Sequence, residues 1–224
     1  MSSKRNRPQA IIFDLDGTLF QTESLSIPAY HATFAQLRSE GLFSAETPPE
    51  SLFLNSLGLL LEEIWARVMP DSSHAARQRA NELLLSYQLQ FLADGHGVMY
   101  PYVNETLEQL HQRGYQLFVA SNGLESYVKN VIDYMGSKRL FAGLYSAGEF
   151  QTASKVDLVG LLLREHRLQS AWMCGDRHSD IEAGRMNGLP TVGCDYGGFA
   201  SPEELKGADF IIQSFSDLLH LLES

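Results

Sequence analysis

The feature that most constrains the fold of this 224-residue chain is a regular alternation of short apolar runs with helical segments from residue 102 onwards. Short strands that alternate with helices of about 10–15 residues indicate a doubly wound parallel sheet. We therefore expect an α/β fold. The predicted strands lie at residues 116–120, 141–145, 171–174, 191–193 and 210–212. The predicted helices lie at residues 103–113, 125–134, 155–167 and 179–187, with a final helix near the C-terminus.

One further strand precedes this region, and a helical block separates it from the rest. Residues 9–14, Gln-Ala-Ile-Ile-Phe-Asp, are a short apolar run that ends in an acid, which is typical of a buried parallel strand. Between residues 24 and 93 the apolar side chains have mostly helical spacing. The Asp-Gly-His-Gly segment at 94–97 is rich in helix breakers and predicts a hinge. We expect residues 1–19 and 97–224 to form the sheet-containing core and residues 20–96 a separate helical domain.

Composition and charge exclude several classes of protein. The chain has 27 acidic and 17 basic residues and a formal net charge of −10, which disfavours a binder of nucleic-acid polymers or anionic membranes. Apolar runs such as residues 57–61 are far shorter than the roughly 18 residues needed to cross a bilayer. The basic first eight residues lead into no continuous apolar segment of the kind found in secretory signals. Two cysteines are too few to staple a fold of this size, so we expect a cytoplasmic protein.

Polar and charged residues gather where the predicted strands end, which is where open α/β sheets bind ligands. An Asp-Gly turn or a lone lysine at a helix start has an ordinary structural explanation when it occurs alone. Four carboxylates at one sheet edge, however, cost Coulomb energy unless a cation neutralises them, and Mg²⁺ is the divalent ion that prefers few carboxylates and retained waters. The residues concerned are Asp14, Asp16, Gly17 and Thr18 after the first strand, Ser121 and Asn122 after the second, Lys155 at a helix start, and Asp176 and Asp180 after the fourth.

The chemistry expected of this set is phosphoryl transfer. Asp14, at the end of a rigid strand, is predicted to be the nucleophile, and Asp16 the general acid and then the general base. Asp14, Asp176 and the backbone carbonyl of Asp16 are predicted to bind Mg²⁺, with Asp180 orienting them. Lys155 and Ser121 would neutralise the transferred phosphoryl group. We expect its oxygens to be bound by Ser121, Asn122, Gly17 and Thr18.

The motifs resemble those of the haloacid dehalogenase superfamily over nearly the whole chain. Phe13-Asp-Leu-Asp-Gly-Thr-Leu19 is similar to its first motif, Ser121-Asn122 to the second, Lys155 to the third, and Gly175-Asp176 with Asp180 to the fourth. The resemblance implies a Rossmann-like core with a helical cap inserted between the first two motifs. It also implies a Mg²⁺-dependent phosphatase acting on a small phosphorylated metabolite, similar to the phosphoglycolate phosphatase and 5′-nucleotidase branch.

Three departures and two alternatives qualify this interpretation. Gln21-Thr22 replaces the Asp-Ser or Asp-Thr common in the family, Val156 stands where proline often follows the lysine, and Leu57-Gly58-Leu59 replaces a Gly-x-Pro stretch of the cap. The last departure leaves the substrate open between small acids, nucleoside monophosphates and sugar phosphates.

A sugar phosphomutase shares all four motifs and is the alternative from another class. Asp16 disfavours a dehalogenase, because a leaving halide needs no proton. The sequence does not indicate the oligomeric state or the roles of Arg177 and His178, although Arg177 is a candidate to balance the charge of the acids.

Overall fold

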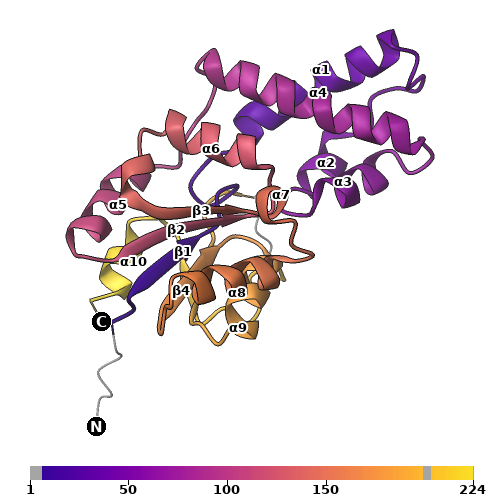
Figure 1. Ribbon diagram of the computed structural model, residues 1–224. Coiled ribbons are helices and arrows are strands. Elements are labelled where there is room, and N and C mark those ends of the chain that lie inside the picture. The colour runs from indigo at the N-terminus through magenta and orange to yellow at the C-terminus, as the bar shows by residue number, and fades with distance from the viewer. Residues whose placement is uncertain (1–6, 199–202, 224) are drawn as a thin grey trace.

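A single six-stranded parallel sheet forms the centre of the protein (Figure 1). The computed structural model describes residues 7–198 and 203–223. The strand order is β3-β2-β1-β4-β5-β6, and every neighbouring pair is parallel. The order reverses beside β1, so the carboxyl ends of β1, β2 and β4 meet at one point of the sheet edge. The strands are β1 (Ala10–Phe13), β2 (Gln116–Ser121), β3 (Phe141–Ser146), β4 (Ala171–Gly175), β5 (Thr191–Cys194) and β6 (Phe210–Ile212).

Helices cover both faces of this sheet because its central strands are apolar on both sides. Along β1, Ile11 and Phe13 pack into one hydrophobic cluster, and Ala10 and Ile12 into another on the opposite face. The first cluster includes side chains of α5 (Val103–Gln112), α6 (Glu125–Tyr134) and α10 (Asp217–Leu221). The second includes side chains of α8 (Lys155–Glu165) and α9 (His178–Met186). Two short helical turns, η1 (Lys138–Leu140) and α7 (Ala147–Phe150), flank β3 and were not predicted.

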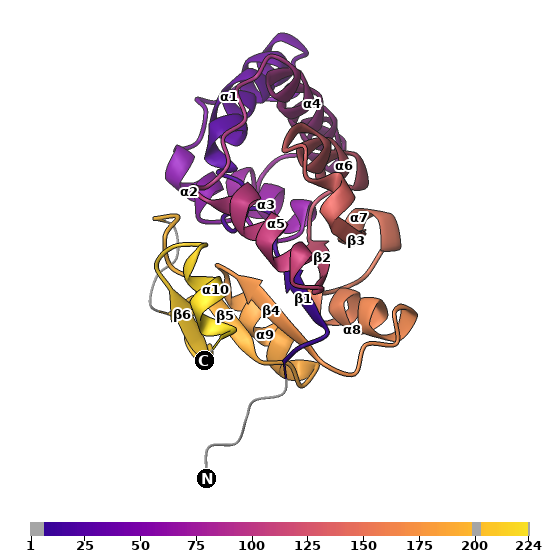
Figure 2. The same ribbon diagram turned by 90° about the vertical axis from the view of Figure 1, so that its left-hand side faces the viewer.

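A block of four helices between β1 and β2 lies over the carboxyl edge of the sheet (Figures 1 and 2). These helices are α1 (Glu23–Ser39), α2 (Glu50–Leu54), α3 (Leu61–Val68) and α4 (His74–Ala93). They enclose a hydrophobic cluster of their own, in which Tyr30, Phe53 and Trp65 are fully buried. We call residues 20–96 the cap. The segments that enter and leave it pair with each other, since the Gln21 N–H donates to the Val98 carbonyl at 2.8 Å.

The predicted fold class is therefore confirmed: a doubly wound parallel sheet with helices on both faces and an inserted block of helices. The residue limits of core and cap stay predictions. In the part of the chain that the structure describes, no helix is both long enough and apolar enough to span a membrane.

Trp65 tests whether the cap depends on its own core. Its ring is fully buried and stacks on Phe53 at a centroid distance of 6.4 Å. We expect Trp65→Ala to lower the free energy of unfolding by about 3–5 kcal/mol, because it leaves a large apolar cavity. Leu52→Ala, at a side chain 40% exposed on the same block of helices, is the control and should cost within about 0.5 kcal/mol. Denaturant titration of both variants measures the difference, and equal losses would contradict the prediction.

Candidate active site

A buried lysine held between two aspartates lies at the carboxyl end of β1. Lys155 Nζ donates to Asp14 Oδ1 at 2.7 Å and to Asp180 Oδ1 at 2.6 Å, and each of the three side chains is at most 3% exposed. Asp14 directly follows β1, and Asp180 lies in the first turn of α9. The Ser154 hydroxyl accepts from the Asp157 N–H at 3.1 Å, and this N-cap makes Lys155 the first residue of α8. Residues of the first, third and fourth sequence motifs thus meet in one ion cluster.

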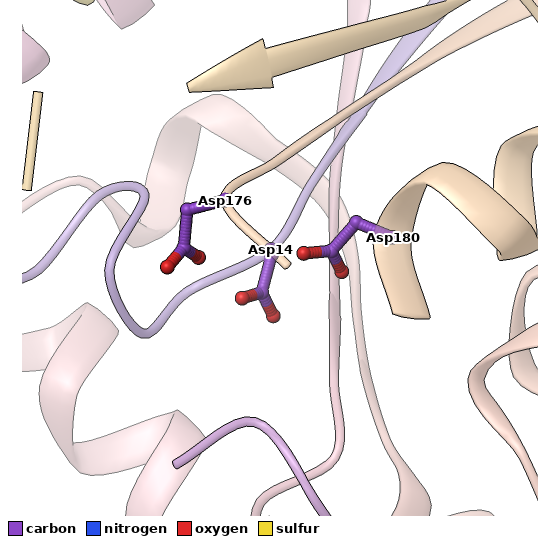
Figure 3. Close-up of side chains that lie close together, drawn as sticks. All are labelled: Asp14, Asp176 and Asp180. Carbon is purple, nitrogen blue, oxygen red and sulfur yellow. The ribbon is translucent and has the colours of Figure 1, made fainter. Parts of the chain in front are cut away.

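Three carboxylates of this region face a common space, as Figure 3 shows. One oxygen each of Asp14, Asp176 and Asp180 lies within 4.8 Å of the others. Both oxygens of Asp180 are engaged, Oδ1 by Lys155 and Oδ2 by the Arg177 N–H at 2.9 Å. Asp14 Oδ2, in contrast, is buried without a hydrogen-bond partner among the described residues. A set of carboxylate oxygens in which one lacks a partner fits a hard divalent cation. Because both oxygens of Asp180 are engaged, Asp14 and Asp176 are the favoured ligands, and Asp180 holds Lys155 and the Arg177 backbone.

Burial and mutual repulsion raise the pKa values of these acids. Burial raises the pKa of Asp14 well above its ordinary value, the Lys155 ammonium offsets part of this, and the neighbouring carboxylates add to it. Burial and then Asp180 raise the pKa of Asp176 to about 7. Burial lowers the pKa of Lys155, but Asp14 and Asp180 more than compensate, so it is raised overall and the lysine stays charged. One lysine does not neutralise the cluster, which leaves it suited to a further positive charge.

Two glycines allow the loops to approach this closely. Gly17 has a φ of +79°, and a Cβ built on it would lie 2.3 Å from Asp176 Oδ2. A Cβ on Gly175 would lie 2.2 Å from Asp180 Cγ. A side chain at either position would displace an acid of the cluster. This requirement explains the Asp-x-Asp-Gly and Gly-Asp patterns of the sequence.

Asp16 lies apart from the carboxylate cluster and faces the cap. Its Oδ1 accepts from the Thr22 hydroxyl at 2.5 Å and from the Tyr127 hydroxyl at 2.7 Å. Burial raises the pKa of Asp16, and these two hydrogen bonds offset part of the rise. Thr22 stands at one of the sequence departures noted above, whereas nothing in the sequence indicates Tyr127, which α6 carries to the site from more than 100 residues away.

Of the remaining predicted residues, two line a cavity and one is buried beside an acid. Ser121 and Asn122 line a hollow of about 660 Å³, counting space open to solvent, together with Asp14, Asp16 and Lys155. The Asn122 amide donates to the Gly58 carbonyl of the cap at 2.7 Å. Thr18 is fully buried, and its hydroxyl donates to Asp176 Oδ1 at 3.2 Å, so its side chain supports an acid.

Arg177 and His178, whose roles the sequence does not indicate, lie at the start of α9. Arg177 Nε lies 3.5 Å from Asp176 Oδ2, as expected of a charge-balancing partner. The His178 side chain is exposed, and its backbone N–H donates to Glu204 Oε2 at 2.8 Å. Neither residue lines the 660 Å³ cavity.

The comparisons with known proteins agree with this geometry. The family described as "Haloacid dehalogenase-like hydrolase" matches residues 11–194. The chain is 28% identical over 223 residues to a phosphoglycolate phosphatase of Vibrio parahaemolyticus, with 95% of each chain covered. It is also 28% identical over 220 residues to the pyrophosphatase PpaX of Listeria monocytogenes, again with 95% of each covered.

Solved structures show the same fold. The crystal structure of CbbY from Rhodobacter sphaeroides in complex with phosphate superposes with a TM-score of 0.82 and 25% identity, over 97% of this chain and all of that one. A predicted phosphoglycolate phosphatase from Haemophilus somnus gives a TM-score of 0.81 at 23% identity, over 97% and 99% of the two chains. The resemblance of the sequence motifs to the haloacid dehalogenase superfamily is confirmed, and the similarity to a phosphoglycolate phosphatase is consistent with that branch.

The acid cluster predicts a pH-dependent response to Mg²⁺. The raised pKa of Asp176, about 7 against an ordinary 3.8, means that the folded protein binds a proton that the unfolded chain has lost. Without metal, this contribution to stability is therefore present below about pH 4 and lost as the pH rises through about 7. Mg²⁺ binds the ionised carboxylates, so we expect its stabilisation to increase over the same range.

Melting temperatures in Mg²⁺ and in EDTA, at about pH 5.5 and about pH 8, measure this response. The gain from Mg²⁺ should be larger at the higher pH and should be much reduced in Asp176→Asn. Asp133→Asn, at an exposed aspartate paired with Lys138 on the surface, serves as the control. An equal gain at both pH values would contradict the prediction.

Proposed function

The chain belongs to the haloacid dehalogenase-like hydrolases, and from this premise we propose that it is a Mg²⁺-dependent phosphatase of small phosphate monoesters, similar to the phosphoglycolate phosphatases. The position of Asp14 carries the proposal. Its carboxylate lines the cavity at the end of β1, with Oδ1 anchored on Lys155 and Oδ2 without a partner among the described residues. A carboxylate held rigidly in the lining of the cavity is suited to attack phosphorus.

The reaction has two displacements at phosphorus. In the first, an Asp14 oxygen bonds to phosphorus, the bond from phosphorus to the ester oxygen breaks, and Asp16 donates its proton to that oxygen, releasing the alcohol. In the second, Asp16 takes a proton from a water molecule whose oxygen bonds to phosphorus. The bond to Asp14 then breaks, and inorganic phosphate leaves. The raised pKa of Asp16 supports its holding a proton for the first step.

The surrounding residues stabilise and orient the phosphoryl group. Lys155 and the Ser121 hydroxyl border the cavity next to Asp14 and supply positive charge and a hydrogen-bond donor. Asp14, Asp176 and the backbone carbonyl of Asp16 would hold Mg²⁺, with Asp180 orienting the set. When bound, the ion supplies positive charge against the phosphoryl oxygens.

The cap, residues 20–96, would close over the site and limit access of bulk water. The contact between Asn122 and the Gly58 carbonyl supports this role, since it joins the phosphate end of the site directly to the cap. The partner is a small phosphorylated metabolite. We also infer a cytoplasmic location, which the two buried, free cysteines support.

Asp14→Asn tests the nucleophile. We expect kcat for a generic phosphate ester to fall by about 10³-fold or more, because the amide cannot form the acyl phosphate. Phosphate release with Mg²⁺ measures the loss, and Asp133→Asn, at the surface ion pair with Lys138, should retain full activity. Substantial Mg²⁺-dependent turnover by Asp14→Asn would exclude the mechanism.

Asp16→Asn tests the general acid. Alkyl alcohols need a proton to leave, whereas p-nitrophenolate does not. The loss in kcat should therefore reach about 10²–10⁴-fold with an alkyl phosphate and be much smaller with p-nitrophenyl phosphate in the first step. Burst kinetics separate release of the phenol from hydrolysis of the intermediate. Equal losses of the burst rate with both esters would assign Asp16 another role.

A further inference from the structure

Among the residues that the structure describes, those that the cap contributes to the wall of the cavity carry no charged side chain. Three charged residues among those described line the cavity, namely Asp14, Asp16 and Lys155. Asp14 and Lys155 belong to the ion cluster, and Asp16 is the acid that Thr22 and Tyr127 hold. The opposite wall is apolar and comes mostly from the cap. Its apolar residues are Phe53, Leu57, Leu59, Leu61, Ile64, Leu84 and Leu85 of the cap, and Leu124 at the start of α6.

The polar groups interspersed in this wall are neutral and mostly bonded within the protein. Gln88 Nε2 donates to Ser26 Oγ at 2.9 Å, and both side chains are buried. The Asn81 amide oxygen accepts from the Trp65 indole. The wall therefore offers a few amide and hydroxyl groups to a ligand but no cation.

The basic residues nearest to the wall are committed to the acids. Lys155 is held between Asp14 and Asp180 at 2.7 and 2.6 Å. Arg177 lies beside Asp176, donates to the Leu54 carbonyl at 3.3 Å and borders a smaller hollow that shares four lining residues with the cavity. Both cations therefore pair with acids of the site, and neither lies among the leucines of the wall.

The chemistry of the wall restricts the alcohol that leaves. A carboxylate or second phosphate placed against leucine side chains would lose its hydration without gaining a counter-charge. Phosphoglycolate, pyrophosphate and a sugar bisphosphate all carry such a group. An uncharged apolar alcohol would instead bury its surface against the leucines, which is favourable.

We infer that the substrate is a phosphate monoester of an uncharged, largely apolar alcohol, and that the cap wall selects against esters with a second anionic group. This inference rests on the proposed phosphatase function and adds the class of leaving group to it. It also separates this chain from the relatives named for phosphoglycolate and pyrophosphate.

A matched pair of esters tests the inference. Benzyl phosphate and 4-carboxybenzyl phosphate have similar leaving groups and differ in one carboxylate far from phosphorus. We expect kcat/KM for phosphate release with Mg²⁺ to favour benzyl phosphate by about tenfold or more, with 2-phosphoglycolate also a poor substrate. Equal or higher kcat/KM for the anionic esters would overturn the inference and leave the phosphatase function intact. Absence of Mg²⁺-dependent phosphate release from every ester would overturn the phosphatase function, and the inference with it.

A cation added to the wall tests whether the lack of charge there sets the preference between the two esters. Leu61→Arg places a guanidinium in the cavity lining, and we expect it to raise the ratio of kcat/KM for 4-carboxybenzyl over benzyl phosphate by about tenfold. Leu52→Arg, at an exposed leucine of α2 outside the cavity lining, is the matched control and should leave the ratio unchanged. The ratio cancels any loss of folded enzyme, and Leu57→Arg replaces Leu61→Arg if that variant does not fold. A ratio that moves no more in the cavity variants than in Leu52→Arg would overturn the role of the wall.

Discussion

The buried ion cluster of Lys155, Asp14 and Asp180 is the interaction on which the rest of the site depends. Removing three charges from water is costly unless each finds a partner. Here one ammonium bridges two carboxylates from separate elements. The bridge joins the end of β1 to the starts of α8 and α9, so the same contact that stabilises the loops also orients Asp14. Burial, together with repulsion among the carboxylates that the ammonium offsets only in part, raises the pKa values of Asp14 and Asp176.

Core and cap divide the site between them. The core supplies the carboxylates, the lysine and the close loop approaches that glycines permit, all on the rigid edge of a parallel sheet. The cap supplies a wall with its own hydrophobic core behind it. Because the two parts are connected by two short paired segments at residues 20–21 and 98–99, the chemistry at phosphorus and the choice of alcohol can vary independently. This arrangement is compatible with the similarity of the chain to relatives named for different substrates.

Much of the site was predictable because it follows from strand topology. The carboxyl ends of parallel strands meet at one edge, so residues that directly follow β1, β2 and β4 must come together. That reasoning brings Asp14, Ser121 and Asp176 to one place without any knowledge of side-chain geometry. It does not extend to Thr18, whose side chain turns away from the cavity to support Asp176, because a residue's position in a loop does not determine the direction of its side chain.

The sequence by itself determined the α/β class, the helical insertion and the identity of the acids and the lysine. Each of these depends on local periodicity or on position relative to a strand end. The tertiary structure alone decided that Thr22 and Tyr127 hold Asp16 and that an uncharged wall of the cap lines the same cavity as Ser121 and Asn122. These features join side chains from the segment before α1, from α6 and from three helices of the cap. Leucines in an amphipathic helix have the same spacing whether they fill a core or line a cavity, and only the packing of the cap against the core distinguishes the two.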